Sequence, residues 1–252
     1  MLARVAPPHP PARRALPAAL VACVAMLSAN SPALGSRVVR GRSVDGKPIV
    51  EVEVGDPHSA RKELVVGCIH GNEPAGTAIA KRLEHSSPRG LDLWVVPELN
   101  PDGRAADTHG NARGVDLNRN FPWRWQRLSG LSYSGPRPLC EPESLIAYRL
   151  LRRLRPQVSI CLHQHLDVVD ESGGRLALER RFAALARMPL ARLAREPGSA
   201  VGWENHAFPG TTAFVVELPP GAPATAAVAR DAQAALQVGL SVNATRTGSR
   251  AH

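Results

Sequence analysis

Apolar runs typical of buried strands alternate with segments of helical spacing along most of this chain. Residues 64–69 form a continuous apolar run, and residues 75–83 then place apolar side chains at helical spacing. The same two patterns predict further strands at 91–96, 158–162 and 213–218 and further helices at 141–154, 176–188 and 224–240. Strands that alternate with helices are typical of a sheet covered on both faces. We therefore predict an α/β fold with a mostly parallel mixed sheet and helices on both faces.

Two stretches depart from this alternation. Residues 38–54 form two short strand patterns joined at Asp45-Gly46, a common turn dipeptide. Residues 100–135 are rich in Asn, Gly, Asp and Arg and show no clear period, which predicts a long irregular segment. A segment of this kind inside a compact domain is usually functional.

The first 36 residues differ in composition from the rest of the chain. They carry Arg4, Arg13 and Arg14 without an acid, then an apolar stretch at 15–29. This order is typical of an export signal, so we predict a signal segment at 1–36, one domain at 37–252, and a periplasmic, secreted or cell-envelope location. Three alternatives remain open: a lipoprotein cleavage box ending at Cys23, an uncleaved helix that tethers the domain to a membrane, and a Pro-rich cytoplasmic arm.

The charge of the chain limits the class of partner. The sequence has 31 basic and 22 acidic residues and a net charge of +9, which falls to +6 without the three arginines of the predicted signal. No basic stripe interleaved with aromatic residues occurs, which argues against nucleic acid as a partner. The remaining positive charge favours a small acidic substrate.

His70 and Glu73 lie where a strand pattern ends and a helix pattern begins. Imidazole and carboxylate are zinc ligands, and a catalytic zinc ion takes three protein ligands and keeps one position open. Chemistry in parallel sheets gathers at the carboxyl ends of strands, where His70, Asn100, His163 and Glu217 all fall. An isolated His-x-x-Glu pair also occurs as a helix cap, so this pair alone does not define a metal site.

Five motifs place these residues in a common context. They are His70-Gly71-Asn72-Glu73, Asn100-Pro101-Asp102-Gly103, Gly114-Val115-Asp116-Leu117-Asn118-Arg119-Asn120-Phe121-Pro122, Ile160-Cys161-Leu162-His163-Gln164 and Phe214-Val215-Val216-Glu217-Leu218-Pro219. In this order they resemble the zinc carboxypeptidase family, and the branch they look most like is that of the murein peptide amidases. The resemblance covers residues 64–220.

This resemblance implies a zinc hydrolase that cleaves an amide bond next to a free carboxylate. The implied residues are His70, Glu73 and His163 as ligands of one zinc ion, Glu217 as the general base, and Asn118 with Arg119 as the carboxylate-binding pair. A guanidinium matches a carboxylate bidentately, which suits Arg119 to this role. The implied substrate is a small cell-wall peptide of the γ-D-glutamyl-diaminopimelate type.

Two positions depart from the pattern of the resembled branch. His109 stands where those proteins carry an Arg that polarises the scissile carbonyl. Protonated His109 is expected to donate to the oxyanion, or Arg113 to take over this task. His165 shares a strand face with His163 and competes with it as third ligand, but the motif places the ligand directly before Gln164.

Asp167 and Asp170 follow the predicted third ligand. In the resembled branch this segment lines the substrate pocket, so both acids are expected to bind an ammonium group of the substrate. A solvated loop is the alternative on sequence alone.

Two other functions remain open. An N-acyl amino acid deacylase of the aspartoacylase and succinylglutamate desuccinylase type shares the His-Gly-Asn-Glu and Asp-Leu-Asn-Arg signals, although Asn100-Pro101-Asp102-Gly103 favours the peptidase. A catalytically silent module that binds cell-wall peptides is the second alternative, and His109 in place of Arg is the feature that favours it.

Overall fold

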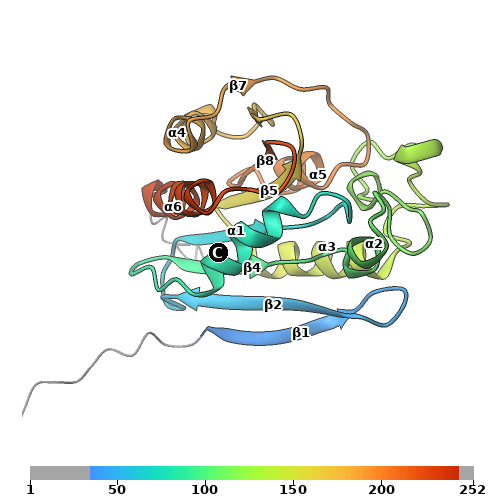
Figure 1. Cartoon of the computed structure of the whole chain (residues 1–252), viewed down its shortest axis with the longest axis horizontal. Coiled ribbons are helices and arrows are strands. Elements are labelled where there is room, and N and C mark those ends of the chain that lie inside the picture. The colour runs from blue at the N-terminus through green and yellow to red at the C-terminus, as the bar shows by residue number, and fades with distance from the viewer. Residues whose placement is uncertain (1–34, 244–252) are drawn as a thin grey trace, which may run out of the picture. The chain divides into compact units, whose positions relative to one another are not determined.

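One eight-stranded sheet organises residues 35–243, the part of the chain that the computed structural model describes (Figure 1). Its strands are β1 (Ser36–Arg42), β2 (Pro48–Gly55), β3 (Lys62–Val66), β4 (Asp92–Val96), β5 (Val158–Gln164), β6 (Val168–Asp170), β7 (Leu190–Ala191) and β8 (Thr212–Leu218). They lie in the order β1-β2-β4-β3-β5-β8-β6-β7. The central strands β4, β3, β5 and β8 run parallel, and β2 and β6 flank them antiparallel.

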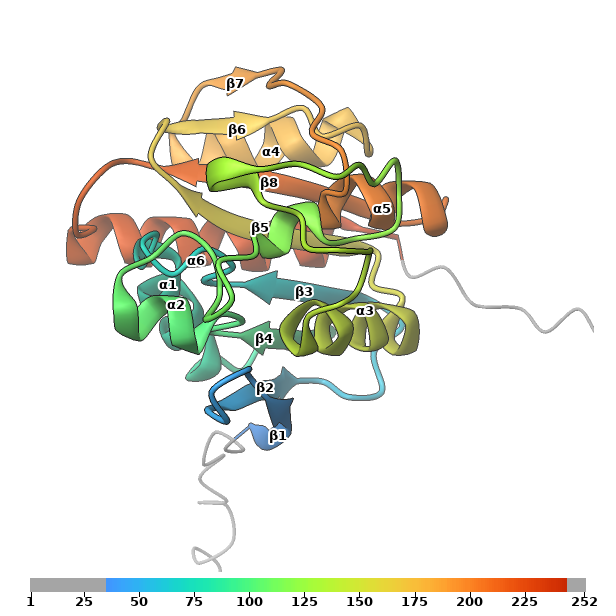
Figure 2. The same cartoon turned by 90° about the vertical axis from the view of Figure 1, so that its right-hand side faces the viewer.

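Helices cover both faces of this sheet. They are α1 (Ala75–Glu84), α2 (Pro101–Ala106), α3 (Pro142–Leu154), α4 (Leu176–Ala186), α5 (Ala200–Ala207) and α6 (Thr225–Ser241), with two 3₁₀ turns, η1 (Leu117–Arg119) and η2 (Gly130–Ser132). Buried residues of α1, α4 and α6 share one hydrophobic cluster with the sheet, and those of α3 and α5 share another. Figure 2 shows α3 and α6 on opposite faces. The predicted α/β fold is confirmed.

Neighbouring residues of the central strands enter the two hydrophobic clusters in turn. Leu64 packs in the cluster of α3, and Val65 packs in the cluster of α1, because successive side chains of a strand point to opposite faces. All seven residues of β5 are buried. The continuous apolar runs of the sequence therefore reflect burial on both faces of the sheet.

Short elements account for the differences from the sequence prediction. The segment at 100–135, predicted as irregular, contains α2, η1 and η2. Asn100 caps helix α2, since its side chain accepts a hydrogen bond from the Gly103 N–H, and Pro101 is the first residue of the helix. Its six residues are too few to show a helical period. Strands β6 and β7 have three and two residues, and α5 carries no apolar stripe, so the sequence prediction lacks them as well.

The predicted signal segment at 1–36 lies outside the described residues except for its last two positions. Ser36 begins β1, so the sheet starts at the predicted domain boundary. Across residues 35–243, every helix is too short or too polar to cross a membrane. The signal and the cellular location therefore stay predictions.

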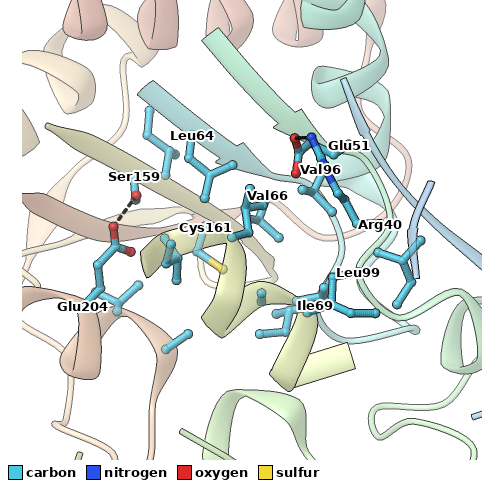
Figure 3. A pocket seen from close by; sticks show the side chains of 18 of the residues that line it. Arg40, Glu51, Leu64, Val66, Ile69, Val96, Leu99, Ser159, Cys161 and Glu204 are labelled. Atoms are coloured by element: carbon cyan, nitrogen blue, oxygen red, sulfur yellow. Dashed lines mark hydrogen bonds and ion pairs between the residues drawn. The ribbon is translucent and has the colours of Figure 1, made fainter. Parts of the chain in front are cut away.

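An apolar cavity of about 40 Å³ lies between the sheet and α3 (Figure 3). Leu64, Val66 and Cys161 line it, together with Glu204 from α5. Glu204 is only 3% exposed, and the Ser159 hydroxyl donates to its Oε1 over 2.6 Å. Burial raises the pKa of Glu204 to about 8, which the hydrogen bond from Ser159 only partly offsets. The folded protein therefore favours the neutral acid at this position.

Glu204→Gln is expected to remove a pH dependence of stability. The folded-state pKa of about 8 lies above the ordinary value of 4.5, so the stability contributed by neutral Glu204 is complete below 4.5 and is lost as the pH rises towards 8. The shift corresponds to on the order of 3–5 kcal/mol. Denaturant unfolding at pH 5 and pH 8 measures it, and the wild type should lose more free energy of unfolding than the variant. Glu196→Gln, at a side chain 44% exposed, is the matched control. Equal losses in wild type and Glu204→Gln would contradict the neutral acid.

Candidate metal and substrate site

The carboxyl ends of the parallel strands bring the predicted site residues to one edge of the sheet. His163 lies near the end of β5 and pairs in register with Glu217 of β8, so the two side chains are neighbours on one face. His70 follows β3, and Asn100 follows β4. The backbone N–H of Asn100 donates to the Cys68 carbonyl over 3.1 Å, which joins the loops after β3 and β4.

A tight turn after β3 places His70 and Glu73 side by side. The Glu73 N–H donates to the His70 carbonyl over 3.1 Å. Gly71 lies against the next loop, where a Cβ would come within 1.9 Å of the carbonyl carbon of Gly103, so only glycine fits. At the end of β5, Gln164 Oε1 accepts a hydrogen bond from the first N–H of α1 over 2.8 Å. The turn is therefore held from both sides.

The Glu73 carboxylate lies between two imidazoles. His70 Nδ1 is 3.0 Å from Oε1, and His163 Nδ1 is 2.9 Å from Oε2. Burial raises the pKa of Glu73, but the adjacent imidazoles of His163 and His70 outweigh burial and hold the pKa below its usual range. His165 is exposed and has no contact with this carboxylate. Of the two histidines left open by the sequence, the structure therefore brings His163 to the cluster.

Asp116 lies behind the stacked rings of His70 and His109. Its Oδ1 is 3.0 Å from His70 Nε2, its Oδ2 is 3.3 Å from His109 Nε2, and the ring centroids are 3.7 Å apart. Burial raises the pKa of Asp116, but hydrogen bonds from His109 and His70 outweigh burial and lower it. An ionised Asp116 accepts an N–H from each Nε2, which leaves Nδ1 of each neutral ring as an acceptor.

These contacts fit a bound metal ion. Buried Nδ1 of His70 has no hydrogen-bond partner, although it faces Glu73 Oε1 at 3.0 Å. Two acceptors this close repel each other unless a proton or a metal ion lies between them. Two imidazoles and one carboxylate are a donor set that zinc takes. His70, Glu73 and His163 are therefore able to hold the ion.

Glu217 faces this cluster from β8. Burial raises the pKa of its carboxyl group, which the nearby His163 only partly counteracts, and its Oε2 is buried without a hydrogen-bond partner. The antiparallel strand β6 pairs Val168 with Glu217 on the other side. A carboxylate with a raised pKa and a free oxygen is suited to accept and return a proton.

Arg119 and Asn118 lie in η1, directly after Asp116 in the chain. Arg119 Nη1 donates to the Asn118 carbonyl over 3.0 Å, while its buried Nε has no hydrogen-bond partner. Asn118 Oδ1 accepts from the Ala200 N–H over 3.0 Å, and its Nδ2 lies 3.5 Å from His163 Nε2. Arg119 Nε lies near two carboxylates, 3.6 Å from Glu196 Oε2 and 3.9 Å from Asp116 Oδ2. Asn118 links α5 to the metal cluster.

A cleft of about 690 Å³ contains these residues. Part of its wall is a stack of Trp123 on His206, with ring centroids 3.3 Å apart. A second hollow of about 490 Å³ also touches Glu73 and His109, and His165 lines it. Glu73 and His109 therefore line both the cleft and the second hollow.

Three predicted substrate-binding residues either lie outside the cleft or are bound to another protein group. Arg113 lies outside the cleft wall, with its Nη1 3.3 Å from Glu141 Oε2. Asp167 is exposed and also lies outside this wall. Asp170 does line the cleft, but its carboxylate binds Arg195 at 2.9 Å. The structure does not bring Arg113 or Asp167 to the site, and it pairs Asp170 with a protein cation instead of leaving it free for a substrate ammonium.

Sequence reasoning missed several residues of the cleft. Trp123, His206 and Arg195 line it, but the sequence assigned none of them a role, although Trp123 directly follows the motif that ends at Pro122. The contact of Asp116 with two imidazoles had a signal, because the residue stands in the same motif as Asn118 and Arg119.

Known proteins resemble this chain in sequence. A model of the zinc carboxypeptidase family matches residues 20–170. Murein peptide amidase A from Escherichia coli is 29% identical over 147 residues, covering 52% of this chain and 60% of that protein. Carboxypeptidase SOL1 from Arabidopsis thaliana is 31% identical over 140 residues, covering 49% of this chain and 28% of that protein. The chain thus spans less than two thirds of the length of these relatives.

Solved structures resemble it in fold. Murein-tripeptide amidase MpaA from Escherichia coli matches with a TM-score of 0.66 and 25% identity, covering 81% of this chain and 91% of that one. Carboxypeptidase A from Helicoverpa armigera matches with a TM-score of 0.68 at 18% identity, covering 83% of this chain and 68% of that one, which concerns the fold alone. The ligand atoms of His70, Glu73 and His109 lie within 4.8 Å of one another, a spacing that could hold a metal ion. Together with this group, the family match confirms zinc as the predicted cofactor.

Asp116→Asn is expected to weaken zinc binding by about 10–100-fold, since a neutral amide no longer fixes both imidazoles with Nδ1 as acceptor. The amide oxygen can still cap η1, as Asp116 Oδ1 does by accepting from the Asn118 N–H. Competition with a chelator of known affinity measures the change. Asp170→Asn, at a carboxylate of the same cleft that binds Arg195, is the control and should keep the wild-type affinity. An unchanged affinity in Asp116→Asn would show that this carboxylate does not orient the ligands.

Proposed function

This chain belongs to the zinc carboxypeptidase family, and from that membership we propose that it hydrolyses an amide bond next to a free carboxylate in small cell-wall peptides. The observation that carries the proposal is the cluster of His70, Glu73 and His163 with Glu217 on the adjacent strand. Zinc bound there supplies a Lewis acid that polarises a carbonyl and lowers the pKa of water.

Glu217 is proposed as the general base. It takes a proton from the attacking water and returns it to the nitrogen of the leaving amine. Its position beside His163 and its raised pKa, caused first by burial, support both transfers, because a pKa closer to neutrality suits a group that must bind and release a proton. Its unpartnered Oε2 leaves an acceptor for the water.

Arg119 is proposed to bind the free carboxylate of the substrate. Its side chain is 14% exposed in the cleft, and its Nε has no hydrogen-bond partner. Asn118 supports this site by its place next to Arg119 in the chain. Its side chain binds the first N–H of α5 and approaches His163. The role of Asn118 as a direct carboxylate ligand stays a prediction.

A cell-wall peptide is the proposed substrate class. Two of the relatives carry the names murein peptide amidase A and murein-tripeptide amidase. Arg119, Arg124 and Arg195 line the cleft, and Arg195 is already paired with Asp170. Arg119 and Arg124 favour a leaving residue with more than one carboxylate, such as a diaminopimelate type. The second hollow beyond Glu73 leaves room for the acyl side of the peptide.

Export to the periplasm, the cell envelope or the medium is proposed as well. The basic and then apolar composition of residues 1–36 supports it, and so does the proposed substrate. A contact with the membrane through that segment is expected only if the signal is not cleaved.

Glu217→Gln is expected to lower kcat for muropeptide hydrolysis by about 10²–10⁴-fold while the zinc content stays at the wild-type level. The amide keeps the shape of the side chain but cannot carry the proton. Mass spectrometry of products from a muropeptide mixture measures turnover, and metal analysis measures zinc. Glu98→Gln, outside the cleft, is the control. Wild-type turnover in zinc-loaded Glu217→Gln would exclude Glu217 as the base.

The same assay separates the remaining functions. Release of acetyl or succinyl groups from amino acids, without muropeptide cleavage, would favour the deacylase. Binding of muropeptides by the zinc-loaded wild type without any product would favour the binding module.

Arg119→Met is expected to lower kcat/KM by about 100-fold for a peptide with a free terminal carboxylate, because two charge-assisted hydrogen bonds are lost. An analogue with an amidated terminus should be cleaved at nearly the same rate by variant and wild type. Arg113→Met, which alters an arginine bound to Glu141 outside the cleft, is the matched control. An equal loss on both substrates would mean that Arg119 supports the fold of the site and does not recognise the carboxylate.

A further inference from the structure

The cleft and the second hollow meet at the metal cluster. Glu73 and His109 line both spaces, and Arg119 lines the cleft alone. A peptide with its terminal carboxylate at Arg119 and its scissile amide at the metal cluster therefore continues into the hollow on its acyl side. The chemistry of the hollow wall thus decides which acyl residues the protein accepts, an inference that rests on the proposed function.

The two spaces differ in charge. Arg119 and Arg124 line the cleft, whereas the described residues that line the hollow include neither arginine nor lysine. His109 belongs to both walls, but its Nε2 faces Asp116 Oδ2 at 3.3 Å and is thereby paired with a carboxylate of the protein. The leaving side is therefore suited to an anion, and the acyl side is not.

The metal cluster does not supply the missing positive charge. A bound zinc ion carries two positive charges, and the carboxylates of Glu73 and Asp116, which face the imidazoles, balance them. Glu217 on the adjacent strand adds a further negative charge when it acts as the base. A second carboxylate on the acyl side would therefore meet a cluster without surplus positive charge, where like charges at short range repel each other.

Two exposed side chains of the hollow wall offer both kinds of hydrogen-bonding group. Asn72 has an amide oxygen and an amide nitrogen, and neutral His165 has one acceptor and one donor nitrogen. Gln164, by contrast, already donates to the carbonyls of Pro219 and Gly221. A carboxamide uses donors and acceptors alike, whereas a carboxylate only accepts and would leave acceptors of the wall facing a negative charge.

We propose that the protein selects, on the acyl side of the scissile bond, a residue whose second carboxyl group is amidated, so that a neutral carboxamide lies in the second hollow. The substrate class is then a peptide with an anionic leaving residue and a neutral, hydrogen-bonding acyl residue. The family resemblance implied a γ-D-glutamyl residue, which carries a free α-carboxylate near the scissile γ-amide. The hollow of this chain favours the α-amide of that residue.

The test compares two peptides that differ only in this group, with either a free α-carboxylate or an α-carboxamide on a γ-D-glutamyl residue joined to diaminopimelate. The zinc-loaded full chain is expected to hydrolyse the carboxamide with a kcat/KM at least about tenfold higher, because the carboxylate leaves acceptors of the wall unpaired and gains no cation. Mass spectrometry of the products from an equimolar mixture of both peptides measures this ratio directly.

A cation added to the hollow should remove the preference. Asn72→Arg is expected to bring the ratio of the two rates to about one or below, because the guanidinium pairs with the carboxylate. Leu131→Arg, at a side chain 82% exposed on the hollow wall, adds the charge outside the metal-binding turn and should shift the ratio in the same direction. Gln233→Arg, in a separate hollow beside α1 and α6, is the matched control and should keep the wild-type ratio. Metal analysis verifies that each variant holds zinc.

The outcomes separate this inference from the proposed function. Hydrolysis of the carboxylate peptide at an equal or higher rate by the wild type would overturn the inference and leave the function intact. An unchanged ratio in both zinc-loaded Asn72→Arg and Leu131→Arg would also overturn it, since the acyl residue would then lie elsewhere. A ratio that falls equally in Gln233→Arg would assign the effect to net charge and overturn it as well. Failure of the zinc-loaded wild type to hydrolyse either peptide would overturn both the inference and the proposed function.

Discussion

A carboxylate between two imidazoles is the interaction around which the site is arranged. Glu73 presents one oxygen to His70 and the other to His163, at 3.0 and 2.9 Å. Asp116 accepts a hydrogen bond from His70 Nε2, which leaves the lone pair of His70 Nδ1 directed towards Glu73. Such a group of electron pairs is repulsive by itself and favourable around a shared cation. The affinity for zinc therefore depends on how the fold places His70, Glu73 and His163 from separate segments next to one another.

The sheet supplies this placement through its parallel centre. Strands β5 and β8 are neighbours, and their register sets a metal ligand beside a carboxylate on the same face. Strand β6 flanks β8 on its other side, so the part of β8 that carries Glu217 is paired with a strand on each edge. The proposed reaction needs His163 and Glu217 close together, and the pairing of β5 with β8 holds them there.

The sequence predicted the parts of the fold that have a period. The long strands and helices were visible because burial on both faces leaves apolar runs, as in β5. Helix α2 and strand β7 are too short to show a pattern. At the site, motif order identified His70, Glu73 and His163, but the nearness of His109 to Glu73 follows from the path of a loop that has no periodic signal. Likewise, the pairing of Asp170 with Arg195 depends on a partner 25 residues away in an irregular segment.

The contact of Gly71 with Gly103 limits which residues one side of the site can accept. Backbone meets backbone there without room for a side chain, so the turn of the metal ligands and the loop beginning at Asn100 form one rigid block. The wall that carries Arg195 and Glu196 belongs to no regular element. At its end, Gly198 lies close to the Arg119 backbone, where a Cβ would come within 2.3 Å of the Arg119 carbonyl oxygen. Attempts to redesign which peptides the protein accepts should therefore begin with residues 192–195, because Glu196 and Gly198 contact Arg119.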